Sequence, residues 1–153
     1  MGKRDFGEAE RMLYIYTEKF GMIQAMAQGV RYAKSKLRCN LDLFSYSNFS
    51  LVAGKDFWHI TDAEEIKSNK KIIENEKNLN MFSRIANFLM RMIRGEEKNG
   101  FVWQEVKKIF LSGGDEIETV AGILHNLGYM TEVPESKKEK ISAINRAIKE
   151  SML

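Results

Sequence analysis

The stretch Met12-Leu-Tyr-Ile-Tyr-Thr-Glu-Lys-Phe-Gly-Met-Ile-Gln-Ala-Met-Ala27 decides the fold of the N-terminal part of this chain. Two short apolar runs, rich in aromatic and β-branched residues, flank residues 18–21, where a glycine can take the positive φ of a tight turn. The stretch therefore predicts a β-hairpin. A second pair of such runs, residues 44–52 and 57–61, is joined through Ala53-Gly-Lys-Asp56 and predicts a second hairpin.

The periodicity changes after Thr61. Thr61-Asp-Ala-Glu64 has the spacing of a capping box, which predicts that a helix begins there. Apolar residues then recur at a helical period in three stripes, and residues 101–111 form a less regular helical stretch, so we expect about five helices. The stripes are Phe82, Ile85, Ala86, Leu89 and Ile93; then Ile117, Val120, Ala121, Leu124 and Leu127; then Ile141, Ile144 and Ile148. The sequence predicts an α+β chain, with a β domain over residues 1–62 and an all-helical domain over residues 63–153.

The composition excludes several classes of protein. The chain has 153 residues, 44% of them hydrophobic, and a net charge of only +3, so wholesale disorder is excluded. With Cys39 as the single cysteine, neither an intrachain disulfide nor a zinc quartet can form. No apolar run approaches the roughly 20 residues that cross a bilayer, and the N-terminus has no secretory h-region. We therefore expect no membrane association and a cytoplasmic location.

Motifs of catalytic chemistry are absent from the sequence. It contains no GxxxxGK[ST], GxGxxG, HExxH or GxSxG pattern, and its two histidines do not by themselves make a metal site. We expect no catalytic residues, no metal, no cofactor and no enzymatic activity.

The most directional feature is a window without acidic residues between Glu18 and Asp42. It holds Lys19, Arg31, Lys34, Lys36 and Arg38. Phosphate binding needs cations that converge without competing carboxylates, and nearby aromatic rings offer faces for unstacked bases. Tyr32 and Tyr46, and Tyr14 or Tyr16 on the first hairpin, are the candidate rings. The window predicts a groove for a single strand of nucleic acid; the alternative is a solvated basic loop beside tyrosines that pack in the sheet, and composition does not decide between them.

Four blocks of the sequence resemble the N-terminal domain of the bacterial RecO family, in the same order and with similar spacing. They are Phe6-Gly-Glu-Ala-Glu-Arg11, Thr17-Glu-Lys-Phe-Gly21, Gly29-Val-Arg-Tyr-Ala-Lys-Ser-Lys-Leu-Arg38 and Phe57-Trp-His-Ile-Thr-Asp-Ala-Glu64. In the helical half, residues 101–106 and 116–132 are similar to a helix pair of RecO proteins that ends in a Leu-Gly-Tyr turn. The resemblance implies an OB-type β-barrel followed by an all-helical domain.

The chain departs from the RecO family pattern in two respects. RecO proteins normally have a further apolar segment before Arg4, so this chain begins inside the expected first barrel strand. Three explanations stay open: the start is misassigned, the barrel is open and lacks most of that strand, or another segment covers the gap. Many relatives also have a longer C-terminal region with a cysteine-rich insert, so this chain is expected to be a short, zinc-less variant.

The function that the resemblance implies is that of a non-enzymatic mediator of DNA repair and recombination, cytoplasmic and associated with the nucleoid. Such a protein binds single- and double-stranded DNA, promotes annealing, and helps to replace the single-stranded-DNA-binding protein with the RecA recombinase, usually together with RecR. Arg31, Lys34, Lys36 and Arg38 match the basic segment of the family, which makes them expected phosphate contacts. Tyr32 and Tyr46 are expected to stack on bases.

A partner surface is also implied by the resemblance. The helical domain of RecO proteins binds the acidic tail of the single-stranded-DNA-binding protein, and Arg84, Arg91 and Arg94 flank an apolar stripe that suits such a tail. A solvated helix face is the alternative for these arginines. The alternative for the whole chain is a protein-interaction adaptor, which would use the helical domain and keep the OB-like part as a scaffold without DNA affinity.

Overall fold

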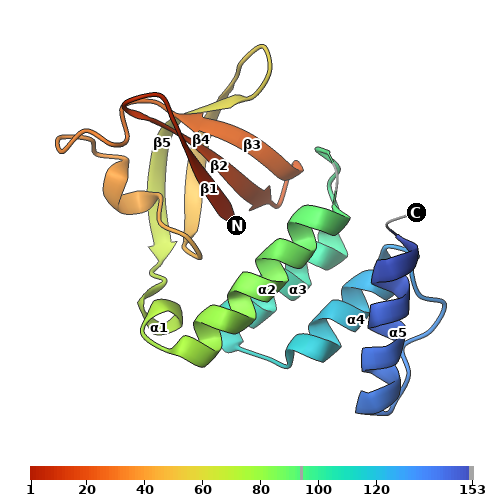
Figure 1. Ribbon diagram of the computed structural model, residues 1–153. Helices are drawn as coiled ribbons and strands as arrows, with labels where there is room; N and C mark the ends of the chain where they lie inside the picture. The colour runs from red at the N-terminus through yellow and green to blue at the C-terminus, as the bar shows by residue number, and fades with distance from the viewer. Residues whose placement is uncertain (94, 152–153) are drawn as a thin grey trace. The chain divides into compact units, whose positions relative to one another are not determined.

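The computed structural model describes residues 1–93 and 95–151, apart from the side chain of Cys39. Arg94, one of the arginines expected to bind a partner, lies outside the described residues. The chain forms two compact units, Met1–Glu97 and Lys98–Leu153. The first unit holds the strands and helices up to residue 97, and the second unit holds the remaining helices; the ribbon in Figure 1 is coloured by residue number.

The first unit contains a five-stranded sheet in the order β1-β2-β3-β5-β4 (Figure 1). Neighbouring strands are antiparallel except for β3 and β5, which are parallel. The strands are β1 (Gly2–Phe6), β2 (Glu10–Thr17), β3 (Gly21–Ala27), β4 (Tyr46–Ala53) and β5 (Trp58–Lys67). This is the sheet of an OB-like domain, and both predicted hairpins are confirmed as β2–β3 and β4–β5.

The first strand of the sheet is β1, which pairs with β2 at five positions, from Gly2 opposite Tyr14 to Phe6 opposite Glu10. Its side chains after Gly2 are exposed. β1 and β4 stand at the two ends of the strand order. A first strand of five residues is therefore present and paired, although the resemblance left open that most of this strand is missing.

Residues on alternate positions of the strands form the core of the sheet. Leu13 of β2 and Ile23, Ala25 and Ala27 of β3 share one buried cluster with Ile60 of β5. Side chains of a strand alternate between its two faces, so these odd-numbered positions of β2 and β3 lie on the same face. On the other face, Met12, Tyr16, Met22 and Met26 are also buried. Strands β2 and β3 are therefore buried on both faces.

The predicted helix start at Thr61 is wrong. Thr61 and the rest of the apparent capping box lie in β5, where Asp62 is opposite Ser50 and Glu64 is opposite Asn48 of β4. The register of this pair shifts between Ser50 and Leu51, which leaves Thr61 without a partner position. Residues 62 and 63, where the sequence places a domain boundary, thus both lie within β5. Pairing with β4 determines the conformation here, and the local spacing does not.

Two helices follow the sheet within the first unit, α1 (Lys70–Ile73) and α2 (Glu76–Met92). The side chain of Asn75 accepts a hydrogen bond from the backbone N–H of Asn78 and so caps α2. Helix α2 buries Ile85, Ala86 and Leu89, as its stripe predicts. The sulfur of Met90 lies 3.1 Å from the position that a Cβ on Gly2 would take, and the rings of Phe82 and Phe44 are 6.1 Å apart. Helix α2 therefore packs against the strand domain and the loop before β4.

The second unit consists of α3 (Gly100–Ser112), α4 (Glu116–Asn126) and α5 (Lys137–Glu150). Side chains of Asn99, Asp115 and Ser136 accept hydrogen bonds from the first turns of α3, α4 and α5, respectively. Val102, Ile109, Ala121, Ile123 and Leu124 are almost fully buried. The expectation of about five helices is met by α1 to α5. No helix in residues 1–93 and 95–151 is long and apolar enough to span a bilayer.

Candidate nucleic-acid interface

The basic loop, residues 28–45, connects β3 to β4 and includes a short 3₁₀ helix, η1 (Arg38–Asn40). Val30 and Leu41 are buried in the sheet core, and Leu37 packs against the same cluster. Successive turns are closed by backbone hydrogen bonds, from Ser35 N to Tyr32 O and from Arg38 N to Ser35 O. The apolar residues thus fix the loop on the end of the sheet, and the side chains between them extend into solvent.

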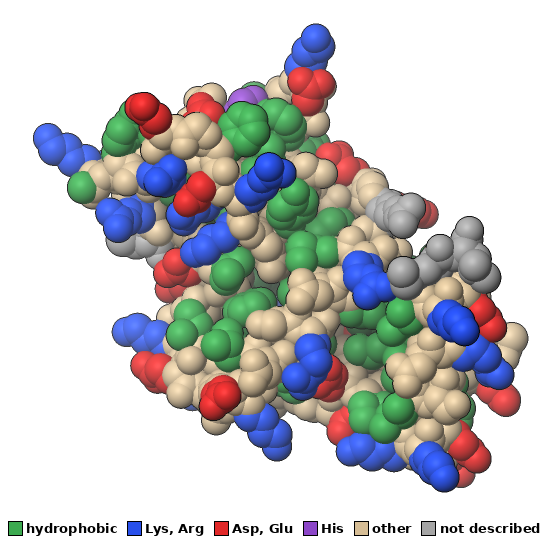
Figure 2. All heavy atoms as spheres, viewed as in Figure 1, with side chains coloured by type: hydrophobic (Ala, Val, Ile, Leu, Met, Phe, Trp, Pro, Cys, Tyr) green, Lys and Arg blue, Asp and Glu red, His purple; other side chains and the backbone are tan. Residues whose placement is uncertain are grey.

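Lys34, Lys36 and Arg38 are exposed, and they form no ion pair with any residue that the structure describes. The view in Figure 2 shows Lys and Arg side chains gathered over the part of the molecule that carries this loop, with some carboxylates among them. The net charge of the chain comes from the same unit, since residues 1–97 hold 16 Lys and Arg against 13 Asp and Glu, whereas residues 98–153 hold eight of each.

Arg31 differs from the other three cations because it is tied to the turn between β1 and β2. Its backbone N–H donates to the carbonyl of Ala9, its Nη1 donates to the carbonyl of Gly7 at 3.2 Å, and its Nε lies 3.8 Å from Oδ2 of Asp5. The window that contains no acidic residue in the sequence is therefore not free of carboxylates in space. Asp5 lies on β1, 26 positions before Arg31, so the sequence does not show that the two residues are neighbours in space.

The candidate stacking residues differ in their accessibility. Tyr32 is 63% exposed on the basic loop. Tyr46 is half-buried at the start of β4, opposite Lys67, and has interactions with other residues. Tyr16 is buried within β2, and this burial raises its pKa to about 12. Tyr16 therefore does not offer a ring face to a base, whereas Tyr32 does.

Sequence reasoning missed two groups of residues that are partly accessible near the loops of the sheet. The first is Asp5 with Arg11, which the β1–β2 register places opposite each other. The second lies on the β4–β5 hairpin, where Val52 is 55% exposed and opposite His59, and the rings of Phe57 and His59 are 6.3 Å apart. A prediction of β1 as a strand would have revealed the first group, because the register of two paired strands determines which residues lie opposite each other.

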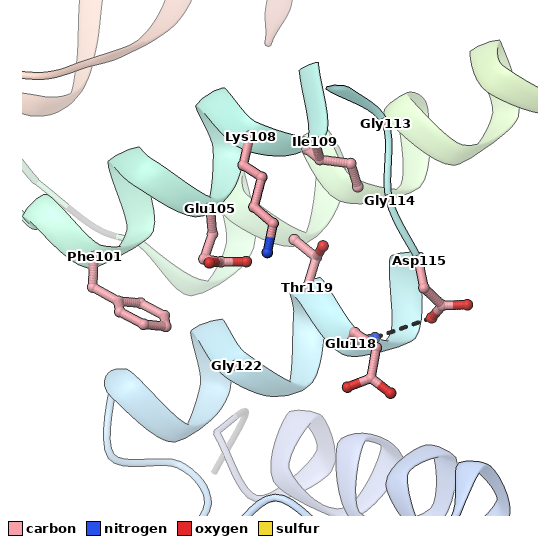
Figure 3. A pocket seen from close by; sticks show the side chains of 10 residues that line it. All are labelled: Phe101, Glu105, Lys108, Ile109, Gly113, Gly114, Asp115, Glu118, Thr119 and Gly122. Atoms are coloured by element: carbon pink, nitrogen blue, oxygen red, sulfur yellow. Dashed lines mark hydrogen bonds between the residues drawn. The ribbon is translucent and has the colours of Figure 1, made fainter. Parts of the chain in front are cut away.

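The second unit contains a cavity of about 390 Å³ between α3 and α4. Figure 3 shows Glu105 and Lys108 extending from α3 toward α4, with Phe101 at one end of the cavity and Asp115 and Glu118 at the start of α4. Gly122 lacks a side chain at the contact with the Phe101 ring, which leaves space between the two helices. The lining of the cavity thus combines the apolar side chains of Phe101 and Ile109 with charged side chains from both helices.

Arg84 and Arg91 do not line this cavity. They are exposed on α2 of the first unit, seven residues apart and hence on the same helix face, and both interact with other groups of the chain. Among the residues that the structure describes, no three His, Cys, Asp or Glu side chains are grouped so that they could hold a metal ion.

Comparison with known proteins identifies the strand domain. The family profile described as "Recombination protein O N terminal" matches residues 1–69, which include all five strands. The chain is similar to proteins named "DNA repair protein RecO" from several bacteria. That of Alkaliphilus metalliredigens is 32% identical over 97 residues, which are 63% of this chain and 38% of the relative. That of Synechocystis is 28% identical over 127 residues, 83% of this chain and 45% of the relative. That of Dehalococcoides mccartyi is 44% identical over 66 residues, 43% of this chain and 26% of the relative.

The matched regions thus span less than half the length of these relatives. The profile match ends two residues after β5, so the similarity described by the profile and the OB-like sheet cover the same part of the chain. The basic loop and the Asp5–Arg11 pair both fall inside it. Residues 1–69, which form the OB-like sheet, therefore match the N-terminal domain of RecO proteins.

Proposed function

We propose that this chain binds DNA through the basic loop and acts in DNA repair and recombination as a mediator without catalytic activity. The observation that carries the proposal is the exposure of Lys34, Lys36 and Arg38, three cations without an ion pair among the described residues, on the loop of an OB-like domain. Cations that converge on a backbone release counterions from nucleic acid, and this release supplies sequence-independent affinity.

The fold supports the same proposal. OB-folds bind oligonucleotides across strands 2 and 3 and with the loops between strands 1 and 2 and strands 4 and 5. Here Arg31 joins the basic loop to the β1–β2 turn, so cations reach one of those loops. The exposed ring of Tyr32 lies within the same segment and provides a stacking face that accepts any base. We infer single-stranded DNA as the principal ligand, with double-stranded DNA bound through the phosphates alone.

The partners that the resemblance to RecO proteins implies are part of the proposal. A RecO protein would promote annealing, exchange the single-stranded-DNA-binding protein for RecA, and work with RecR. Arg84 and Arg91 on α2 are the proposed contacts for the acidic tail of the single-stranded-DNA-binding protein, together with Arg94.

Salt dependence tests the DNA proposal directly. Each phosphate neutralised on a single strand contributes about −0.7 to the slope of log K against log salt, so four cations predict a slope of about −2.8. Replacing Lys34, Lys36 and Arg38 with Ala should leave a slope of about −0.7, because only Arg31 remains. Fluorescence anisotropy of a labelled oligonucleotide between 50 and 300 mM salt measures both slopes.

A matched control removes the same charge elsewhere. Lys137, Lys138 and Lys149 are exposed on α5, so their triple Ala variant changes the net charge equally without touching the loop. It should keep a slope near −2.8. A wild-type slope near zero, or the same slope for both triple variants, would refute the assignment of the loop.

A protein-interaction adaptor is the second candidate function, and the cavity between α3 and α4 favours it. Its exposed Phe101 and the charged side chains of Glu105 and Lys108 in its lining are features of a peptide-binding groove. This function predicts tight binding of a partner that survives both moderate salt and the triple substitution of the loop, in a protein with no measurable affinity for DNA.

A further inference from the structure

Asp5 lies between two arginines, one from the sheet and one from the basic loop. Its Oδ1 accepts a hydrogen bond from Nε of Arg11 at 2.7 Å, and its Oδ2 lies 3.8 Å from Nε of Arg31. Asp5 is on β1, Arg11 on β2, and Arg31 on the basic loop. One carboxylate is thus shared by two guanidinium groups at the end of the loop that we assign to DNA.

The group is accessible to solvent and carries excess positive charge. The side chains of Asp5, Arg31 and Arg11 are 48%, 41% and 21% exposed. Within the part of the chain that the structure describes, neither Nη atom of Arg11 makes a hydrogen bond. The hydrogen bond from Arg11, with the charges of Arg11, Arg31 and Lys3, lowers the pKa of Asp5, so Asp5 is ionised at neutral pH. One negative charge therefore faces three positive charges.

A phosphate diester and a carboxylate compete for the same donors. Guanidinium groups bind both anions through parallel N–H donors, and the Arg11 fork still has donors available. A carboxylate at 2.7 Å and 3.8 Å from two guanidinium groups cancels part of the field that attracts a phosphate. The two arginines therefore carry donors of the kind that bind a phosphate, and Asp5 competes for these donors.

We propose that Arg11 and Arg31 form a phosphate-binding pair for the DNA backbone and that Asp5 acts as a built-in competitor, which limits the affinity of this pair. The inference rests on the proposed function and deepens it, since it adds Arg11 to the DNA contacts and assigns Asp5 a regulatory role. The limited affinity lets the chain dissociate from DNA, as expected of a protein that binds a strand and then leaves it.

The sign of two substitutions distinguishes this role from a structural one. Asp5→Asn removes the competing charge, so it should tighten binding of a single-stranded oligonucleotide about fivefold at 0.1 M salt, the contribution of one phosphate contact, and steepen the slope by about 0.7. Arg11→Gln should weaken binding by about the same factor and flatten the slope. If Asp5 only orients the arginines, both substitutions should weaken binding.

Two controls keep the test sharp. Glu64→Gln makes the same change in net charge on β5, where Glu64 forms no ion pair within the described residues, and should change affinity less than twofold. Thermal unfolding confirms that each variant is folded, and Asp5→Ser replaces Asp5→Asn if the latter is not. Binding by a folded Asp5 variant that equals or falls below wild type overturns the inference while leaving the basic loop in place. A wild-type slope near zero overturns the proposed function itself. It also overturns this inference, unless the Asp5 variant binds the oligonucleotide.

Discussion

Gly21 at the turn between β2 and β3 is the position where a single methyl group should have the clearest effect on stability. Its φ is +68°, in the left-handed region that costs other residues about 1–2 kcal/mol. A Cβ at this position would lie 2.9 Å from the carbonyl carbon of Glu97 and closer still to its oxygen. The methyl group of Gly21→Ala therefore meets backbone, which has to move.

The segment that would move is held by identifiable contacts. Oε1 of Glu96 accepts a hydrogen bond from Nε1 of Trp58 at 2.8 Å, and the ring of Trp58 packs against Phe20 at 5.0 Å in the same turn. Loss of one such hydrogen bond costs about 0.5–1.5 kcal/mol. With the cost of the left-handed backbone, Gly21→Ala should lower the free energy of unfolding by about 2–3 kcal/mol.

Gly7→Ala is the matched control. Gly7 has a φ of +60°, but its Cβ would meet only the end of the Glu10 side chain at 3.8 Å, so only the backbone cost of about 1–2 kcal/mol applies. Urea unfolding in a Trp103→Phe background lets the fluorescence of Trp58 report on the first unit alone. Equal losses for Gly21→Ala and Gly7→Ala would refute the argument that residues 96–97 pack on the turn.

Three further outcomes are expected. Tyr32→Ala should weaken single-strand binding about tenfold with an unchanged salt slope, since stacking contributes about 1–3 kcal/mol per base, whereas Tyr32→Phe should bind as wild type; an equal loss for both in anisotropy titrations would exclude stacking. Asp115 accepts hydrogen bonds from the backbone N–H groups of Glu118 and Ile117, which lower its pKa below 3.8. The contribution of these hydrogen bonds to stability is therefore complete well above pH 3.8 and disappears as the pH falls through the lowered pKa. Asp115→Ala should lower the free energy of unfolding by about 1 kcal/mol at pH 7 and flatten the acid dependence of the melting temperature. A variant that keeps the full wild-type acid dependence would contradict this role of Asp115. Leu124→Ala, at a fully buried site, should cost about 2–5 kcal/mol, against less than about 0.5 kcal/mol for the exposed Ile141→Ala. Urea unfolding in a Trp58→Phe background, followed by the fluorescence of Trp103, measures both, and similar losses would contradict the assigned core.

Local patterns predicted most of the elements because their cause is local. The hairpins β2–β3 and β4–β5 follow from short apolar runs around turn residues, and the stripes of α2 and α4 follow from a period of 3.6 residues. The stripe predicted for α5 is wrong in part, because Ile141 is 42% exposed and the buried residues of this helix are Lys140 and Ala147. The caps at Asp115 and Ser136 are likewise decided within one helical turn. The failure at Thr61 has the opposite cause. There, hydrogen bonding of β5 to β4 outweighs a capping-box spacing that has no helix to cap.

The features of the candidate site also divide into those that the sequence predicts and those that only the structure reveals. The exposure of Lys34, Lys36 and Arg38 follows from a polar segment between apolar anchors, which the sequence displays directly. The pairing of Arg31 with Asp5 depends on a loop that returns to the β1–β2 turn, and no periodicity encodes such a return. The sequence also made Tyr14 or Tyr16 a candidate ring beside Tyr32 and Tyr46, yet burial removes Tyr16 from any interaction with a base.

By itself, the amino-acid sequence determined the order of strands and helices, the concentration of positive charge in one loop, and the likeness to RecO proteins, since each of these is written in neighbouring residues. Only the tertiary structure decided where β5 ends, which tyrosine is accessible, and that Asp5 stands between Arg11 and Arg31. The physical reason is that strand register and loop closure bring together residues distant in the chain, and electrostatic interaction depends on that distance in space.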